Sequence, residues 1–476
     1  MVHQFKNNGY NIVLDVNSGM VHVVDDLAYD IIELYEKKDK GEIISAMVEK
    51  YSQPKYMKLI TSQEGKQHDF SENIEMLVTQ IHEVVEDVGQ LAKDGSLFTK
   101  DIYEEYIREF KQRSTVVKAL CLHIAHDCNL ACRYCFAEEG EYRGHRELMS
   151  YEVGKQAIDF LIANSGNRKN LEVDFFGGEP MMNFQVVKDI VKYGRELESL
   201  HNKKFRFTLT TNGILLDDAS MEFANKEMSN IVLSIDGRKE VNDRMRPSRN
   251  GKGSYDIIVP KFQKLAELRN QTNYYVRGTF THNNLDFSED VKHLAELGFK
   301  QISVEPVVAL PEDSYAITEA DLPKLYEEYD KLAQLILEYK KEGKEFNFFH
   351  FMIDLTGGPC VAKRLSGCGS GTEYLAVTPW GDLYPCHQFV GIPEYLMGNV
   401  FEGVKTPELR EEFKFCNVYS KKKCTDCFAK FYCSGGCAAN SFKFHGDIND
   451  AYDIGCELQK KRIECAIMLK AASAEV

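Results

Sequence analysis

Between residues 116 and 307, the apolar and polar positions predict strands and helices in regular alternation. Short runs rich in β-branched and aromatic residues are typical of buried strands. Longer amphipathic stretches are typical of helices, such as Tyr151–Ala163, which follows the candidate helix cap Ser150, and Phe184–Leu200. The expected strands are Val116–Ile124, Leu171–Phe176, Phe205–Thr210, Asn230–Ser234, Tyr274–Thr281 and Gln301–Val307. Six such units predict an α/β fold, in which a parallel sheet curls into a partial (β/α)6 TIM-like barrel.

The first hundred residues follow a different pattern. Two β-rich runs, Asn11–Val16 and Val21–Asp25, are joined by Asn17-Ser-Gly19, which is a hairpin signal. The polar stretch 52–69 predicts a loop, and the expected helices are Ala28–Glu36, Ile43–Tyr51 and Glu72–Ala92. We therefore expect a winged-helix-like domain over residues 1–105, the barrel over 106–345 and a third domain over 346–476.

Charge changes what the first domain is expected to bind. Winged-helix domains often bind DNA, but residues 1–100 hold ten Lys and Arg against seventeen Asp and Glu, and the whole chain carries a net charge of -15. This balance disfavours nucleic acid as a partner. A peptide that adds as an extra strand at the edge of the hairpin fits better.

The cysteines and the apolar runs bear on compartment and chemistry. The N-terminus lacks a basic start followed by an apolar segment, and no apolar run approaches membrane-spanning length. We therefore expect a cytoplasmic protein without a membrane partner. Its fourteen cysteines are then expected to be reduced, which favours metal or cluster ligands over disulfides.

Polar and glycine-rich motifs follow the first four expected barrel strands. In such barrels the chemistry lies at the C-terminal ends of the strands. The motifs are Cys128–Cys135, Gly177-Gly178-Glu179-Pro180, Thr210-Thr211-Asn212-Gly213 and Ser234-Ile-Asp236-Gly237. Glycines let backbone approach a ligand closely, and Thr211, Asn212 and Ser234 offer short polar groups suited to a ribose. Four motifs at four successive strand ends indicate one ligand-binding site.

The first of these motifs has three cysteines, Cys128, Cys132 and Cys135, with three and then two residues between them. A structural zinc site or a ferredoxin-type cluster needs four protein ligands. Three thiolates can hold three irons of a 4Fe–4S cluster and leave the fourth iron free for a small molecule. This open iron favours catalysis over electron storage.

The loop resembles the cluster loop of the radical S-adenosylmethionine (SAM) superfamily. The resemblance implies that SAM chelates the open iron and that one electron cleaves it to a 5′-deoxyadenosyl radical. It also implies that the Gly177–Pro180 element holds the SAM amino group and that Arg246 reaches the SAM carboxylate, with Asn242 standing where many members carry histidine. The SAM-binding residues implied in this way are Tyr134, Gly177, Gly178, Glu179, Thr211, Asn212, Ser234, Arg246 and Arg277.

Ten of the cysteines lie between Cys360 and Cys465, and this density favours metal binding. In isolation, Cys424 to Cys437 would also fit a zinc site. The spacing is similar to the SPASM extension of radical SAM enzymes, which implies two auxiliary 4Fe–4S clusters and three clusters in all. The resemblance places one cluster on Cys368, Cys386 and Cys437, with Cys360 a candidate fourth ligand, and the other on Cys424, Cys427, Cys433 and Cys456. Cys121 and Cys465 are expected to be core residues, and Cys416 stays unassigned.

The order of motifs along nearly the whole chain resembles the thioether-forming maturases of SCIFF peptides, which are small cysteine-rich ribosomal peptides. This implies that the N-terminal domain binds the leader of a precursor peptide. The enzyme would then join a peptide cysteine sulfur to a carbon atom of the same peptide. An electron donor such as flavodoxin or ferredoxin is the second partner implied.

Two other functions remain open from the sequence. Sulfatase maturation by formylglycine formation would use the same cofactors, but it needs no leader-binding domain. A regulator with a DNA-binding winged helix and a zinc-ribbon tail belongs to another class, and the acidic N-terminal balance and the Gly177–Pro180 motif both oppose it.

Overall fold

The computed structural model describes residues 1–53, 55–56, 70–110, 115–355 and 361–474. The chain forms two compact units. The smaller consists mainly of Met1–Tyr106 and includes the end of the chain from Ile463 onward, whereas the larger holds most of Ile107–Arg462. Each unit is described by itself.

The smaller unit contains a three-stranded antiparallel sheet in the order β1 (Val2–Asn7), β2 (Tyr10–Asp15) and β3 (Val21–Val24). The expected hairpin of β2 and β3 is confirmed. Strand β1 was not predicted, although Asn8-Gly9 between β1 and β2 is a strong hairpin signal. Both turn residues have positive φ, 46° for Asn8 and 86° for Gly9, as a two-residue turn of this kind requires.

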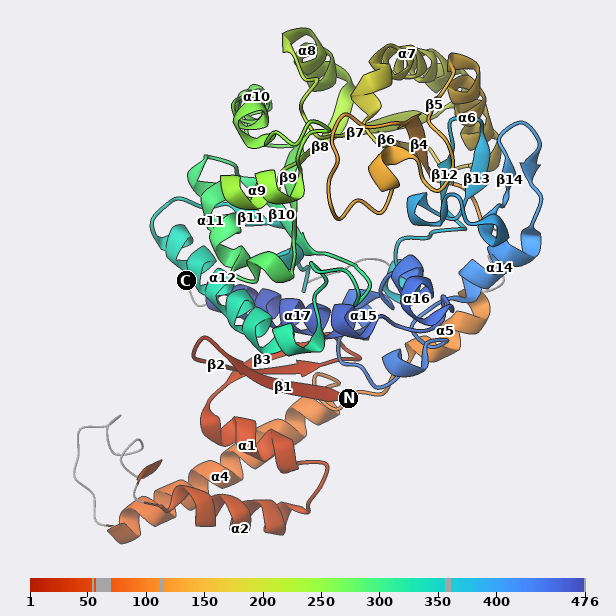
Figure 1. Ribbon diagram of the computed structural model, residues 1–476. Coiled ribbons are helices and arrows are strands. Elements are labelled where there is room, and N and C mark those ends of the chain that lie inside the picture. Colours follow the sequence, from red (N-terminus) through yellow and green to blue (C-terminus); the bar gives the residue numbers. More distant parts are fainter. Residues whose placement is uncertain (54, 57–69, 111–114, 356–360, 475–476) are drawn as a thin grey trace. The chain divides into compact units, whose positions relative to one another are not determined.

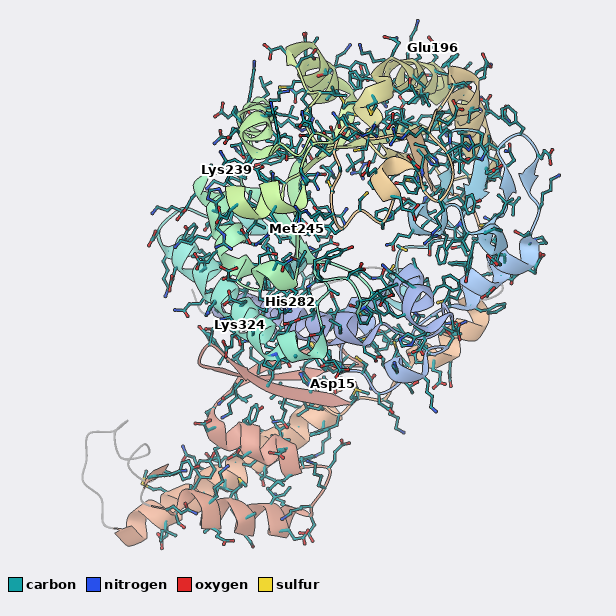
Figure 2. The ribbon with its side chains drawn as sticks, in the orientation of Figure 1. Asp15, Glu196, Lys239, Met245, His282 and Lys324 are labelled. Atoms are coloured by element: carbon teal, nitrogen blue, oxygen red, sulfur yellow. The ribbon has the colours of Figure 1, made fainter. Side chains whose placement is uncertain are left out.

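Helices pack on this sheet and enclose an apolar core. They are α1 (Asp26–Leu34), α2 (Lys40–Tyr51) and α4 (Phe70–Lys93), and α5 (Tyr103–Phe110) follows them. Their apolar faces bury Ile31, Ile43 and Leu77 in one cluster. Asp15, labelled in Figure 2, is buried at the end of β2 and accepts hydrogen bonds from the backbone N–H groups of Ser18 and Thr99. Most of the expected loop 52–69 lies outside the described residues.

The larger unit is built on a twelve-stranded sheet that follows the order β11-β10-β9-β8-β7-β6-β4-β12-β13-β14-β15, with β5 paired to β4. Neighbouring strands from β4 to β11 along this path run parallel. The parallel barrel strands are β4 (Ala119–His126), β6 (Asn170–Gly177), β7 (Lys204–Thr211), β8 (Met228–Ser234), β9 (Tyr274–Phe280), β10 (Gln301–Pro306) and β11 (Asn347–Phe348). The first six confirm the expected six-strand parallel sheet, which curves as an open, partial barrel (Figure 1).

Helices connect these strands and lie on the outer face of the sheet (Figure 1). They are α6 (Tyr151–Asn164), α7 (Phe184–His201), α8 (Asp218–Glu227), α9 (Lys239–Met245), α10 (Tyr255–Leu268), α11 (Phe287–Glu296) and α12 (Leu322–Lys341). Ser150 caps α6 as expected, because its side chain accepts a hydrogen bond from the Val153 N–H. The sheet is thereby buried on one face, and its strand ends remain free to carry polar loops.

The cysteine-rich region continues the same sheet. Its first strand, β12 (Tyr374–Val377), pairs in parallel with β4. The short strands β13 (Asp382–Tyr384), β14 (Gly398–Asn399) and β15 (Gly403–Val404) follow in antiparallel pairs, and β5 is Glu147–Leu148. The helices of this region are α13 (Val361–Ser366), α14 (Pro407–Phe415), α15 (Lys430–Cys433), α16 (Ala438–His445) and α17 (Asp453–Ala474). Within the described ranges, no helix is long and apolar enough to cross a bilayer.

Candidate cofactor sites

The three-cysteine loop follows β4 at the C-terminal end of the barrel strands. Its backbone is fixed to the segment after α9: the Ala131 N–H donates to the Pro247 carbonyl at 2.8 Å, and the Arg133 N–H donates to the Met245 carbonyl at 2.9 Å. Met245, the last residue of α9, is labelled in Figure 2. These bonds fix the loop across the mouth of the barrel.

The three thiols of this loop lie close enough to influence each other. Burial raises the pKa of Cys128 to about 12 and that of Cys132 to about 11, and the neighbouring thiols of the loop add to both shifts. The backbone N–H of Leu130 points at the Cys128 sulfur at 3.5 Å. Such thiols stay protonated until a metal displaces the proton, so the loop is a set of donors that suits iron.

A cluster and a single metal ion need different arrangements of protein ligands. Among the residues that the structure describes, no three Cys, His, Asp or Glu side chains converge tightly enough to hold one metal ion. One zinc ion draws its ligands to about 2.0–2.3 Å, whereas each cysteine of a 4Fe–4S cluster binds a different iron, so the sulfurs stand farther apart. Three cysteines in one loop match the number of protein ligands that a 4Fe–4S cluster with one open iron needs.

Glu179 joins the ends of β6 and β7. Its side chain is 1% exposed and accepts hydrogen bonds from the Thr211 hydroxyl at 2.8 Å, the Asn212 N–H at 2.7 Å and the Met181 N–H at 3.0 Å. Burial raises the pKa of Glu179 to about 7, although these hydrogen bonds oppose the shift. The Asn212 side chain in turn donates to the Asn129 oxygen at 2.7 Å, which ties β7 to the cysteine loop. The structure thus brings Glu179, Thr211 and Asn212 together beside the cysteines.

The two glycines before Glu179 are required by the chain's own packing. A Cβ on Gly178 would stand 2.2 Å from the Asp127 carbonyl oxygen, and one on Gly177, which has φ +121°, would stand 2.4 Å from the Ala125 oxygen. The Gly177 carbonyl accepts a hydrogen bond from the buried Tyr142 hydroxyl at 3.0 Å. Sequence reasoning did not single out Tyr142, because nothing in the sequence connects it with a glycine 35 residues away.

A second group of hydrogen-bonded side chains joins the cysteine loop to β8 and to the residue after α9. The Tyr134 hydroxyl donates to Asp236, with its oxygen 2.7 Å and 2.8 Å from the two carboxylate oxygens, and it accepts from Arg246 at 2.9 Å. Burial raises the pKa of the fully buried Asp236 to about 6, while Arg246 and Tyr134 act to lower it. Within the described chain, the buried Nε of Arg246 has no hydrogen-bond partner, so this guanidinium keeps a donor for an anion such as the SAM carboxylate.

The role of Asp236 was missed because Asp-Gly after a strand is typical of a turn. Asn242, at the position where many superfamily members carry histidine, is also fully buried. Its side chain donates to the Ser254 hydroxyl at 3.0 Å and accepts from the Asp236 N–H at 3.3 Å. Asn242 therefore holds the β8–α9 connection in place.

The remaining predicted SAM contacts lie on β8 and β9. Ser234, at the end of β8, pairs with Arg277 of β9 in the sheet. Arg277 is half-exposed and donates to Glu305 of β10 at 3.1 Å. Burial acts to raise the pKa of Glu305, but Arg277 and His350 outweigh it and lower that pKa to about 2. Arg277 is thus already paired with a carboxylate, unlike the Arg246 Nε.

The cysteines of the C-terminal region fall into two groups in space. Burial raises the pKa of Cys386, and the thiols of Cys437 and Cys368 add to that shift. In the second group, burial raises the pKa of Cys456 to about 12, with contributions from Cys433, Cys424 and Cys427. Cys360 lies outside the described residues. As expected for core positions, Cys121 and Cys465 are buried.

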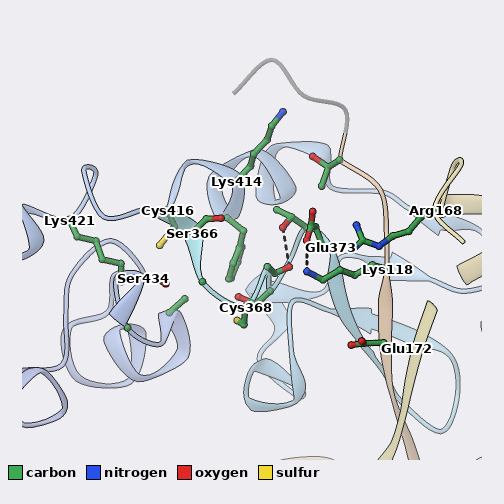
Figure 3. A pocket seen from close by; sticks show the side chains of 18 of the residues that line it. Lys118, Arg168, Glu172, Ser366, Cys368, Glu373, Lys414, Cys416, Lys421 and Ser434 are labelled. Atoms are coloured by element: carbon green, nitrogen blue, oxygen red, sulfur yellow. Dashed lines mark hydrogen bonds and ion pairs between the residues drawn. The ribbon is translucent and has the colours of Figure 1, made fainter. Parts of the chain in front are cut away.

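A cavity of about 570 Å³ adjoins the first group. Its lining includes Cys368 and Cys416, together with Gly436 and Ala438 on either side of Cys437. In Figure 3, Cys368 lies between a wall that carries Lys118, Glu373 and Arg168 and another that carries Cys416 and Ser434. A space of this size beside thiol donors can accommodate a cluster, with room left toward the opening.

Comparisons with known proteins give a family model, curated relatives and solved structures that are similar to this chain. A family model described as a 4Fe-4S single cluster domain matches residues 114–260. An uncharacterised protein of Methanocaldococcus jannaschii is 27% identical over 299 residues, which are 62% of this chain and 94% of that protein. A cysteine-type anaerobic sulfatase-maturating enzyme of Clostridium novyi is 23% identical over 356 residues, 71% of this chain and 92% of the enzyme. The radical SAM cyclopropyl synthase TigE of Paramaledivibacter caminithermalis is 21% identical over 376 residues, 72% of each chain.

Solved structures share the fold at low sequence identity. The anSMEcpe protein with bound AdoMet has a TM-score of 0.63 at 20% identity and covers 75% of this chain and 99% of its own. Streptococcus suis SuiB bound to SAM has a TM-score of 0.53 at 16% identity and covers 96% of this chain and 98% of its own. SuiB bound to the precursor peptide SuiA gives 0.51 at 16% identity with the same coverage. Together these matches show that the chain is similar to radical SAM enzymes, sulfatase-maturating enzymes among them, and that it shares the fold of the solved structures.

Proposed function

We propose that the chain is a radical SAM peptide maturase that joins a cysteine sulfur to a carbon atom within a ribosomally made, cysteine-rich precursor peptide. The observation that carries the radical SAM part is the three-cysteine loop at the end of β4, ringed by Glu179, Asp236 and Arg246. The cofactors would be SAM and three 4Fe–4S clusters, which supply reductive cleavage of SAM and removal of a hydrogen atom from the peptide.

In this proposal the chain's own residues bind the clusters and orient SAM. Cys128, Cys132 and Cys135 would hold three irons of the first cluster. The unpaired Arg246 Nε fits the SAM carboxylate, and the Glu179 carboxylate, which has lone pairs beyond the three bonds it accepts, fits the SAM ammonium. Holding the amino and carboxylate groups, which share one carbon atom, would fix that end of SAM beside the first cluster. The two auxiliary clusters would be held by Cys368, Cys386 and Cys437, and by Cys424, Cys427, Cys433 and Cys456.

The N-terminal unit favours a leader-dependent peptide substrate. The anSMEcpe structure covers 75% of this chain, whereas SuiB, which is also solved with a precursor peptide, covers 96%. In the smaller unit, β3 pairs with β2 alone among the described strands, and Val23 on it is 44% exposed. An apolar edge strand of this kind can accept a leader peptide as an additional strand.

The proposed reaction balances. The peptide loses one hydrogen atom, which ends in 5′-deoxyadenosine, and the cysteine thiol loses one proton. One electron enters to cleave SAM, and one electron leaves when the carbon–sulfur bond closes. The product is therefore the peptide minus two hydrogen atoms and minus one free thiol.

Mass spectrometry of the product tests this proposal. Reduced, cluster-loaded protein is incubated anaerobically with SAM, dithionite and a cysteine-rich precursor peptide with its leader. Loss of two hydrogens together with one alkylatable thiol supports the thioether. Loss of two hydrogens with every thiol still alkylatable rejects it.

Sulfatase maturation is the second candidate, because curated relatives include enzymes of that activity. A short sulfatase-derived peptide without a leader distinguishes the two. Conversion of its target serine or cysteine to an aldehyde, detected with a hydrazide reagent, would favour formylglycine formation. The thioether proposal predicts no aldehyde.

A further inference from the structure

Basic side chains gather at the N-terminal ends of β6 and β7, the strand ends opposite the proposed SAM site. We define the basic rim as Arg168, Lys169, Lys204 and Arg206. Lys169 directly precedes β6, and the Lys204 N–H at the start of β7 donates to the Lys169 carbonyl at 2.8 Å, so these cations lie at the same end of the two strands. Among the described residues, no carboxylate lies within 4.0 Å of Arg168, Lys169 or Lys204, and Arg206 is 3.9 Å from Glu172.

The basic rim continues into the cavity beside Cys368. Arg168 and Arg206 of the rim line that cavity, together with Lys118 and Lys414. The lining has two carboxylates, Glu172 and Glu373, and Glu373 is already paired with Lys118 (Figure 3). Among the described residues Lys414 is also paired, with Glu411 at 3.4 Å, so the positive charge of the surface from the rim to Cys368 rests mainly on Arg168, Lys169 and Lys204.

This local charge is opposite to that of the molecule. With a net charge of -15, the chain repels an acidic partner at long range, except where cations gather on one face. Lysines and arginines spread evenly over a solvated surface would not produce a local region of positive potential. An acidic partner that approaches this protein is steered toward the rim.

The position of the rim indicates the class of partner. Cys368 on the cavity wall is exposed and is an expected ligand of an auxiliary cluster, so a protein docked on the rim stands close to a redox centre. The proposed reaction takes up one electron and releases one. We propose that the basic rim and the mouth of this cavity are the docking surface for a small acidic electron-carrier protein.

This identification of the partner rests on the proposed function, whereas binding of an acidic protein to the rim can be measured by itself. Docking at this end of the strands also leaves the opposite end free for SAM and peptide. The carrier and the substrate would then bind at the same time without competition.

Binding of FMN-loaded flavodoxin to the full-length, cluster-loaded protein tests the proposal. Isothermal titration calorimetry at increasing NaCl concentrations should show a dissociation constant that rises steeply with salt. The double variant Arg168→Glu/Lys204→Glu should weaken binding by at least about tenfold, because two attractive charges become repulsive. Arg168→Lys/Lys204→Arg, which keeps both charges, should bind within about twofold of the natural chain.

The matched control carries the same change in net charge elsewhere. Lys264→Glu/Lys341→Glu alters two exposed lysines on α10 and α12, outside the cavity lining, and should bind flavodoxin within about twofold of the natural chain. Iron content should be unchanged in every variant, which verifies folding. The proposal is overturned if flavodoxin does not bind the natural chain, or if both double charge reversals weaken binding equally.

Two further measurements distinguish the carrier from other ligands of the rim and from a failure of SAM cleavage. Pyrophosphate and the precursor peptide should not displace flavodoxin; displacement by either would assign the rim to that ligand and overturn the proposal. Dithionite-driven formation of 5′-deoxyadenosine needs no carrier and should be equal in the natural chain and the Arg168→Glu/Lys204→Glu variant. If the natural chain formed no 5′-deoxyadenosine, the proposed function would be wrong, but the measured binding of flavodoxin to the rim would still be valid.

Discussion

Glu179 is a buried carboxyl that joins two strand ends, and we propose that it also binds SAM. Three protein donors hold its oxygens in place at the junction of β6 and β7, yet burial raises its pKa to about 7. Its charge therefore changes near neutral pH. A cationic ammonium group placed beside it would favour the ionised form.

This pKa predicts a pH dependence of SAM binding. Below about pH 7 Glu179 is mostly neutral, and above it the carboxylate is ionised, so SAM affinity should rise as the pH increases through about 7. In Glu179→Gln the affinity should be lower and this rise should be absent. Titration calorimetry with SAM between pH 6 and 8 measures both.

The control for this prediction is Glu196→Gln. Glu196 is an exposed carboxylate on α7 (Figure 2), and its replacement should leave the pH profile of the natural chain intact. An identical profile in the natural chain and Glu179→Gln would show that another group sets the pH dependence.

At the scale of elements, the site depends on how closely β4 and β6 approach at their ends. The Cβ of an alanine at position 178 would stand 2.2 Å from the Asp127 oxygen and 3.0 Å from the Gly140 Cα, so the strand ends must separate. We expect Gly178→Ala to lower the free energy of unfolding by about 1–3 kcal/mol and to reduce SAM affinity. Chemical denaturation and calorimetry measure the two effects.

Gly41→Ala is the matched control for that substitution. Its new methyl group would lie 3.4 Å from the Asp39 side-chain oxygen in the first turn of α2, which is an ordinary contact distance. The free energy of unfolding and the SAM affinity of Gly41→Ala should therefore equal those of the natural chain. The packing argument would be contradicted if Gly178→Ala had the same free energy of unfolding and the same SAM affinity as the natural chain.

The edge strand β3 gives a second prediction at this scale. Val23→Lys places a charge on the exposed edge and should weaken leader-peptide binding by several fold, because edge charges oppose strand addition. Fluorescence anisotropy of a labelled leader peptide measures this. Gln80→Lys adds the same charge on an exposed position of α4 and should bind the leader normally; equal weakening by both would reject β3 as the docking edge.

The strands of the barrel were predictable because each is a short, buried, apolar run bounded by polar turns. Leu171–Phe176, for example, lies within the observed β6, Asn170–Gly177. The strands β12 to β15 were not predicted, because they have two to four residues each and gain their stability by extending an existing sheet. Local sequence carries little signal for such pairing.

The site was predictable where motifs end strands and unpredictable where partners are distant. The placement of the cysteine loop and Glu179 directly after β4 and β6 was predictable, and their roles in binding stay predictions. The Tyr142 hydroxyl on the Gly177 carbonyl and the Arg277–Glu305 pair depend on contacts between residues about thirty positions apart. Only the folded sheet brings such residues together.

For the whole molecule, one cofactor site, two further cysteine groups and a separate N-terminal unit serve a single proposed function. In this proposal all of them depend on SAM cleavage at the loop after β4. If SAM is not cleaved there, neither the peptide reaction nor electron delivery by a carrier protein can take place as proposed.

The most direct test is therefore to quantify 5′-deoxyadenosine formed anaerobically from SAM and dithionite. We predict formation by the natural chain and none by Cys128→Ala/Cys132→Ala/Cys135→Ala, which should keep roughly two thirds of the iron, because two of the three expected clusters lie elsewhere. Formation by the triple variant, or none by the fully cluster-loaded natural chain, would contradict the proposed radical chemistry.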